Sequence, residues 1–161
     1  MDAPAEQVRD AAWGAWQSYK QMRTHLTRVI NRFVTERTGL SEADYEILSV
    51  LSGSEDLTMR SLALRADLNW EKSRLSHQLR RMYERGLVAR DACEEDARSS
   101  VIRLTEKGEE AIALARPLYE EAVATCFAAA MSDEDAEVLS KIAARVVELP
   151  EQPVDIDPTR S

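Results

Sequence analysis

One short segment of the sequence concentrates side chains that can bind a polyanion. Between residues 69 and 90, six cationic residues accompany only two acidic ones, Glu71 and Glu84, in a 161-residue chain of formal net charge -8. Guanidinium and ammonium groups bind phosphate oxygens, and arginine also forms paired hydrogen bonds with guanine. The segment therefore indicates non-covalent recognition of a nucleic acid. Its cations are Lys72, Arg74, Arg80, Arg81, Arg85 and Arg90.

The spacing of apolar residues in this segment predicts a helix. Leu75, Leu79 and Met82 fall on one face at about 100° per residue, so this face is expected to be buried. Asn69 is expected to be the N-cap, and Gly86 is expected to adopt the left-handed conformation that often ends a helix. The opposite face is then available to a partner.

That opposite face carries the candidate contacts with double-stranded DNA. In helix-turn-helix proteins the N-terminal half of the second helix enters the major groove, which assigns Ser73, Arg74 and His77 to base edges. Arg80 and Arg81 lie further along the helix, where they suit phosphate groups. A charged face can also be merely solvated, but this one is almost entirely cationic.

Two more residues lie close to this face. Ser76 lies at its margin and is included among the candidate DNA contacts. Trp70 falls in the first turn, where its indole can pack on DNA or fold back against the preceding helix. Packing is the favoured interpretation of Trp70, because first-turn residues often fold back in this way.

The elements around the charged helix predict a winged helix-turn-helix. A capping-box pattern at Ser41 begins a helix that ends near Gly53. Thr58 is expected to cap a short helix, with Leu62 and Ala63 facing inward, and a tight turn leads from it to the charged helix. Two β-prone runs then predict a hairpin. The runs cover residues 87–91 and 101–105.

Longer helices are expected on both sides of this module. Residues 6–36 and 109–148 carry apolar stripes at helical spacing, the second range being divided by a new helix start at Ser132. The winged helix-turn-helix is assigned to residues 41–108. Residues 150–161 hold three prolines and are expected to be a disordered tail. The predicted fold class is mainly α with a small β-hairpin wing.

Charge is distributed unevenly between these parts. Residues 58–108 hold eleven Lys and Arg against eight Asp and Glu, whereas the remainder holds ten against twenty-one. A basic module on an acidic body orients a protein on a polyanion. An adaptor that uses the winged helix to bind protein is an alternative, but the one-signed helix face argues against it.

The sequence resembles the MarR family of bacterial winged-helix regulators. The resemblance rests on Leu62-Ala63, on RGLVAR at 85–90, on DAR at 96–98 and on IRLTEKG at 102–108. It implies a homodimer with interlocking N- and C-terminal helices, an inverted-repeat operator and, in a repressor, release by a small aromatic or phenolic ligand. It also assigns Asp96 and Arg98 to the DNA-contacting wing.

A ligand crevice, where one exists, is expected between the dimerisation helices and the DNA-binding module. The aromatic and basic residues expected near it are also explained as simple core or interface residues. They are Trp13, Trp16, Tyr19, Arg23 and Tyr45.

Several other classes of function receive little support. Nucleophile, phosphate-loop and paired-carboxylate motifs of enzymes are missing, and no cofactor is indicated. His25, His77, Cys93 and Cys126 lack the spacing of metal ligands. Thiol-based sensing through Cys93 in the wing is an alternative, although the acidic residues beside it would raise its pKa. No membrane span or signal peptide is recognised, so a cytoplasmic location is expected.

Overall fold

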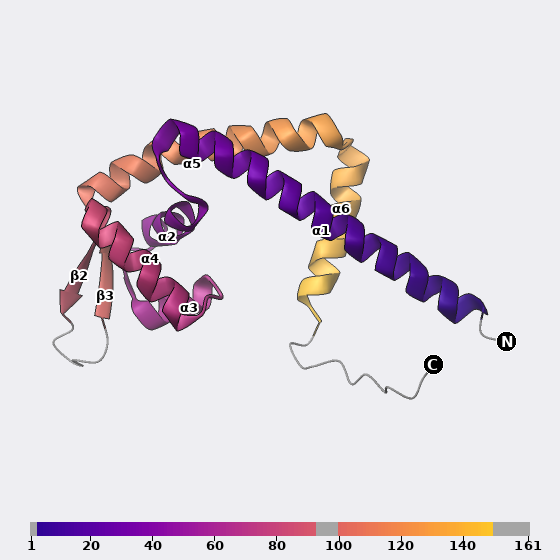
Figure 1. Ribbon diagram of the computed structural model, residues 1–161, viewed down its shortest axis with the longest axis horizontal. Coiled ribbons are helices and arrows are strands. Elements are labelled where there is room, and N and C mark those ends of the chain that lie inside the picture. Colours follow the sequence, from indigo (N-terminus) through magenta and orange to yellow (C-terminus); the bar gives the residue numbers. More distant parts are fainter. Residues whose placement is uncertain (1–2, 93–99, 150–161) are drawn as a thin grey trace. The chain divides into compact units, whose positions relative to one another are not determined.

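The computed structural model describes residues 3–92 and 100–149, which form a mainly helical fold with a small antiparallel sheet (Figure 1). Residue contacts divide the chain into two compact units, Met1–Ala124 and Thr125–Ser161. The winged helix-turn-helix lies in the first unit. In chain order the elements are α1 (Ala3–Thr38), α2 (Glu42–Ser52), β1 (Thr58–Arg60), α3 (Ser61–Asp67), α4 (Lys72–Arg85), β2 (Val88–Ala92), β3 (Ser100–Leu104), α5 (Glu106–Ala130) and α6 (Asp133–Val147).

The sheet contains one strand more than the sequence predicted. Its order is β1-β3-β2, with β3 antiparallel to both neighbours. Thr58 pairs with Arg103 instead of capping a helix, so the prediction for Thr58 was wrong. The physical reason is that β3 has a free edge on the side away from β2, and the residues after Leu57 satisfy its backbone groups.

Helix α3 consequently begins later than predicted and turns a different face inward. It starts at Ser61, and its N-cap, Arg60, makes no side-chain capping bond. Leu64 is fully buried, whereas Leu62 is 67% exposed and Ala63 is also exposed. The prediction that Leu62 and Ala63 face inward was therefore wrong.

Asn69 ends α3 and does not begin α4, which corrects the predicted N-cap. Its φ of 50° is left-handed, a conformation that Asn tolerates better than most residues. The Asn69 amide donates to the Ala66 carbonyl at 3.0 Å, and the Trp70 amide donates to the Arg65 carbonyl at 3.1 Å. These two bonds form a Schellman closure. Helix α4 begins at Lys72, without a side-chain cap.

The buried face and the end of α4 agree with the sequence-based prediction. Leu75, Leu79 and Met82 are at most 5% exposed. Gly86 has φ 71° and ψ 23°, and its amide bonds to carbonyls of the last helical turn. The three apolar side chains hold α4 in the core of the module, so its opposite face is presented to solvent.

The core beneath α4 is built from α1, α2 and the sheet. Ile47 and Leu48 of α2 are fully buried, and Ile30 and Val34 of α1 are at most 5% exposed. The predicted capping box of α2 is confirmed, because the Ser41 side chain accepts from the Asp44 amide and the Asp44 carboxylate accepts from the Ser41 amide.

A close backbone contact fixes the start of α5. Thr105 caps this helix, since its Oγ1 accepts from the Gly108 amide at 3.1 Å. Gly108 lies so close to β2 that a Cβ atom there would be 2.1 Å from the Leu87 carbonyl oxygen. Only glycine allows the two backbones to lie this close. The contact joins the start of α5 to the segment between α4 and β2.

We expect Gly108→Ala to lower the free energy of unfolding by about 1–3 kcal/mol, because backbone atoms must shift to admit the methyl group. Gly14→Ala is the matched control, since nothing lies within 4 Å of a Cβ atom at that helical position. It should stabilise α1 by roughly 0.5–1 kcal/mol. Urea unfolding measures both. A Gly108→Ala variant as stable as the wild type would contradict the close contact.

The second unit contains α6, which begins after Ser132 as predicted and has a capping box between Ser132 and Asp135. No residue of α6 is buried, and its apolar residues lie open to solvent. Across the residues that the structure describes, none of the helices has the length and apolar character that spanning a membrane requires.

Candidate nucleic-acid interface

The outward face of α4 is open to solvent, as a DNA-reading helix requires. All of its predicted contact residues are exposed, and together they carry three arginines and no acidic residue. The side chains nearest the centre of this face are polar or cationic, so they can reach base edges or phosphates. The exposed residues are Ser73, Arg74, Ser76, His77, Arg80 and Arg81.

One of these arginines is held at the edge of the face by Trp70. Trp70 is only 7% exposed, which confirms that its indole packs into the protein. The guanidinium carbon of Arg74 lies 3.8 Å from the centroid of the Trp70 ring, an arrangement that favours a cation–π interaction. Arg74 therefore has an intramolecular partner, unlike Arg80 and Arg81, for which the described residues offer none.

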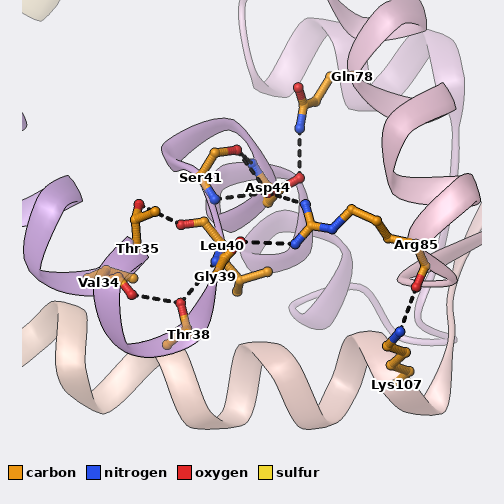
Figure 2. A network of polar contacts seen from close by, with 10 residues as sticks. All are labelled: Val34, Thr35, Thr38, Gly39, Leu40, Ser41, Asp44, Gln78, Arg85 and Lys107. Atoms are coloured by element: carbon orange, nitrogen blue, oxygen red, sulfur yellow. Dashed lines mark hydrogen bonds and ion pairs between the residues drawn. The ribbon is translucent and has the colours of Figure 1, made fainter.

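A buried polar network anchors α4 from the other side (Figure 2). The Asp44 carboxylate, 1% exposed, accepts from Gln78 Nε2 at 2.7 Å and from Arg85 Nη1 at 2.6 Å. Arg85 Nη2 also donates to the Gly39 carbonyl at 3.1 Å. Lys107 Nζ donates to the Arg85 carbonyl at 2.8 Å. The network thus ties the α1–α2 junction and α5 to the recognition helix.

Asp44 remains ionised in this setting. Burial raises the pKa of its carboxyl group, but the hydrogen bonds from Arg85 and Ser41 and the charge of Arg85 outweigh burial and lower the pKa below 3.8. A carboxylate paired with arginine and fully hydrogen-bonded is the form in which a buried charge is tolerated.

Sequence reasoning missed this network and counted Arg85 among the cations available to a partner. Arg85 instead belongs to the scaffold, because its guanidinium is engaged by Asp44 and Gly39. One signal was present in the sequence: at about 100° per residue Gln78 falls beside Met82 on the helical wheel, so a polar side chain borders the apolar face.

The wing strands are linked by an exposed ion pair. Arg103 Nε donates to Asp91 Oδ2 at 2.8 Å, and this pairing raises the pKa of Arg103. The predicted wing contacts Asp96 and Arg98, together with Cys93, lie outside the described residues.

A cavity of about 670 Å³ lies between α1 and the helix-turn-helix. Its walls come from α1, α2, the end of α3 and the first turn of α4. Trp70 and the Arg74 side chain that stacks on it both line the cavity. Of the predicted ligand residues, Arg23 lines this cavity. Tyr45 lines a smaller one of about 210 Å³, where its ring stacks on that of Tyr119 at 4.4 Å between centroids.

Comparison with known proteins agrees with this geometry. A family model for the transcriptional regulator SarA/Rot matches residues 29–114. AbsC of Streptomyces coelicolor, a MarR family transcriptional regulator, is 34% identical, with a TM-score of 0.78 over 86% of this chain and 93% of AbsC. The chain belongs to the MarR family. Among curated proteins, no sequence matches it.

Two further similar structures are of transcriptional regulators in complex with DNA. Sco3205 of S. coelicolor is 28% identical, with a TM-score of 0.77 over 88% of this chain and 91% of its own. MosR of Mycobacterium tuberculosis is 27% identical, with a TM-score of 0.65 over 84% of this chain and 98% of its own. This MarR-family chain is therefore a winged-helix transcriptional regulator, and its family is one of regulators and not of enzymes.

The other aromatic ligand candidates lie away from both cavities of this MarR-family protein. Trp13, Trp16 and Tyr19 are 63%, 50% and 44% exposed on α1. The alternative that they are core residues of the single chain was therefore wrong. Lys20 Nζ lies about 6 Å from each indole centroid, and the Trp16 and Tyr19 rings are 5.7 Å apart. Together they form an exposed aromatic surface.

The potential metal and thiol ligands are dispersed. Within residues 3–92 and 100–149, no group of three or more His, Cys, Asp or Glu side chains could hold a metal ion. His25 lies beside Arg28 on α1, and His77 lies on the outward face of α4. Cys126 of α5 is a free thiol of intermediate exposure.

Proposed function

We propose that this MarR-family regulator is a cytoplasmic repressor that binds an inverted-repeat operator as a homodimer. The observation that carries the proposal is the combination of an exposed, one-signed face on α4 with a buried network that fixes the helix from behind. Rigid support of this kind makes a recognition helix specific, because side-chain positions are set before binding. The structures of Sco3205 and MosR with DNA support DNA as the partner.

The proposed contacts follow the order of residues along α4. Ser73, Arg74 and His77 in the N-terminal half meet base edges, and Arg80 and Arg81 meet phosphates. Ser76 lies on the side toward the wing, where it lines a hollow between α3, α4 and the sheet. The family resemblance makes Asp96 and Arg98 the wing pair, and we propose that Arg98 enters the minor groove while Asp96 holds its guanidinium in place.

Large exposed apolar side chains support the homodimer. Trp13 and Trp16 of α1 are at least half exposed, as are Val138 and Val146 of α6. Large apolar side chains exposed on a helix are typical of a surface that a partner covers. We propose that the partner subunit covers these faces, with residues 6–36 and 109–148 forming the interface.

Ile142→Asp is expected to weaken this dimer, because it places a charge among the exposed apolar residues of α6. Ser140→Asp is the matched control, since it adds the same charge to the same helix away from that face. Sedimentation velocity at several protein concentrations should show monomers for Ile142→Asp and dimers for Ser140→Asp. A wild-type chain that is monomeric throughout would contradict the proposal.

A small aromatic or phenolic acid is the proposed releasing ligand. The cavity between α1 and the helix-turn-helix is lined by Arg23, Arg28 and Arg74, which can pair with a carboxylate, and also by the acidic residues Glu42, Glu46 and Asp67. It also contains the edge of Trp70 and lies against the first turn of α4. A ligand there would act on the element that carries the base-reading residues.

The function is tested by selecting binding sites from a random duplex library with the full-length protein. An inverted repeat should be enriched, with half-site centres about 10 base pairs apart or a multiple of that spacing. Benzoate-type acids should raise the melting temperature of the free protein and weaken operator binding, because the two effects are linked. Failure to enrich any sequence would favour a protein-binding adaptor instead.

A further inference from the structure

Arg74 belongs to two surfaces of the helix-turn-helix. Its side chain is exposed on the outward face of α4, among the proposed base contacts. It also stacks on the Trp70 indole, with 3.8 Å between the guanidinium carbon and the ring centroid, and lines the cavity between α1 and the helix-turn-helix. Arg80 and Arg81, on the same face of α4, do not line that cavity. Arg74 therefore has an intramolecular position that competes with DNA.

The Trp70 indole cannot follow Arg74 toward DNA. The residue is 7% exposed, and its amide is hydrogen-bonded to the Arg65 carbonyl in the closure of α3. A guanidinium that pairs with guanine O6 and N7 must present its nitrogens to a base edge in the groove, outside the protein surface. Because the indole is fixed within the protein, Arg74 has to leave it before it can read a base.

A carboxylate on α2 attracts the same guanidinium. Glu46 lines the cavity beside Arg74. Burial and the charge of Glu42 raise the pKa of Glu46, whereas the charge of Arg74 lowers it. Among the described residues Glu46 has no ion-pair partner within 4.0 Å, so its charge is not compensated at close range. Trp70 and Glu46, which we call the restraining pair, thus both favour the inward position of Arg74.

The other charged residues of this cavity contribute no net charge around Arg74. Two are cationic and two are acidic, so their effects on the guanidinium oppose each other. They are Arg23, Arg28, Glu42 and Asp67. The inward position of Arg74 therefore depends mainly on the restraining pair.

The restraining pair acts against DNA binding. It stabilises Arg74 in the free protein in a position from which no base is reached, and this stabilisation is lost when Arg74 pairs with a guanine. Operator affinity is then reduced in proportion to the fraction of molecules whose Arg74 is available. We propose, resting on the function proposed above, that Trp70 and Glu46 form an autoinhibitory contact that competes with guanine for Arg74. Because the contact lies in the wall of the proposed effector cavity, an acid that pairs with Arg74 there would add to the same restraint.

Two substitutions release Arg74 in different ways. Trp70→Leu removes the aromatic ring and keeps an apolar side chain in the buried position. Glu46→Gln removes the carboxylate charge from a position that is only partly buried, so this variant should fold even where Trp70→Leu is destabilised. Glu84→Gln is the matched control, because it removes the same charge from an exposed position at the far end of α4. Each substitution is also combined with Arg74→Ala.

The affinities of the full-length variants are measured on the operator selected as above and on a random duplex of the same length. Trp70→Leu should raise operator affinity by roughly two- to five-fold per half-site, the range for loss of a cation–π contact at an accessible site. Glu46→Gln should raise it by more than Glu84→Gln does. Both gains should be smaller on random duplex. In the Arg74→Ala background, neither substitution should raise operator affinity more than Glu84→Gln.

The outcomes separate this inference from the proposed function. If an operator is selected but Trp70→Leu and Glu46→Gln both leave its affinity unchanged or lower it, the contact does not oppose DNA binding and only this inference is wrong. Gains that persist undiminished in the Arg74→Ala background would overturn it in the same way. If the wild type selects no DNA sequence, the proposed function is wrong and the autoinhibitory contact with it.

Discussion

Replacing Asp44 with alanine should lower the free energy of unfolding by about 3–5 kcal/mol, the range for breaking a buried ion pair. The substitution leaves the guanidinium of Arg85 with only the Gly39 carbonyl and leaves Gln78, 6% exposed, without its 2.7 Å acceptor. It also removes the Asp44 half of the capping box that begins α2. Urea unfolding followed by circular dichroism measures the loss.

Two controls make this expectation specific. Arg103→Ala breaks an ion pair with a similar distance, 2.8 Å, but both partners are nearly half exposed, so the melting temperature should stay close to that of the wild type. Asp44→Asn retains the shape and loses the charge, and it should fall between wild type and Asp44→Ala. Equal losses for the Asp44→Ala and Arg103→Ala variants would show that burial of the network contributes nothing.

The charge of Asp44 also predicts a pH dependence. Its pKa is lowered in the folded protein from 3.8, so the folded state binds the proton less readily than the unfolded chain. The resulting stabilisation is complete above about pH 4 and is lost as pH falls through the lowered folded-state pKa. The free energy of unfolding of the Asp44→Asn variant should lack this pH-dependent contribution. The exposed Asp135 has a pKa lowered in the same direction, but it is present in both proteins and cancels in the difference.

The sequence predicted the parts of this fold that local signals control. The buried face of α4, the capping box at Ser41, the helix start at Ser132 and the left-handed Gly86 depend on residues within a few positions of one another. Side-chain periodicity and capping chemistry report such local structure directly. The winged helix-turn-helix followed from the order of these elements.

The predictions that failed depended on partners distant in the sequence. Thr58 is a good helix cap by type, but β3, more than 40 residues later, offers it strand pairing. The pair between Asp44 and Arg85 joins residues 41 positions apart, and no local pattern distinguishes Arg85 from its exposed neighbours. The six cations of residues 69–90 thus fall into three groups. Arg85 belongs to the scaffold, Arg74 rests on Trp70, and the others are exposed.

The stacking of Arg74 on Trp70 sharpens the distinction between reading and anchoring along α4. A cation–π contact at an accessible site contributes about 0.5–1 kcal/mol. A bidentate contact from arginine to guanine O6 and N7 contributes roughly 1–3 kcal/mol of discrimination. The contact with guanine is the more favourable of the two, so we expect Arg74 to leave the Trp70 indole when a guanine is within reach.

Arg74→Ala should therefore weaken operator binding by roughly 1–3 kcal/mol per half-site, and twice that for a symmetric dimer, with relaxed base preference at one position of each half-site. Its affinity for random duplex should change much less. Arg80→Ala, almost two turns further along the exposed face, should weaken operator and random DNA alike and reduce the salt slope by about one phosphate contact per subunit.

Binding isotherms for both variants on both DNAs, at several salt concentrations, decide between the two roles, and thermal unfolding of the free proteins adds an independent measurement. An Arg74 that stays on Trp70 in the complex would give a different pattern, because Arg74→Ala would then leave base preference unchanged. Loss of specific and non-specific affinity in the same proportion for both variants would show that α4 does not enter the groove in the proposed orientation. Its cations would then serve as an undirected electrostatic anchor.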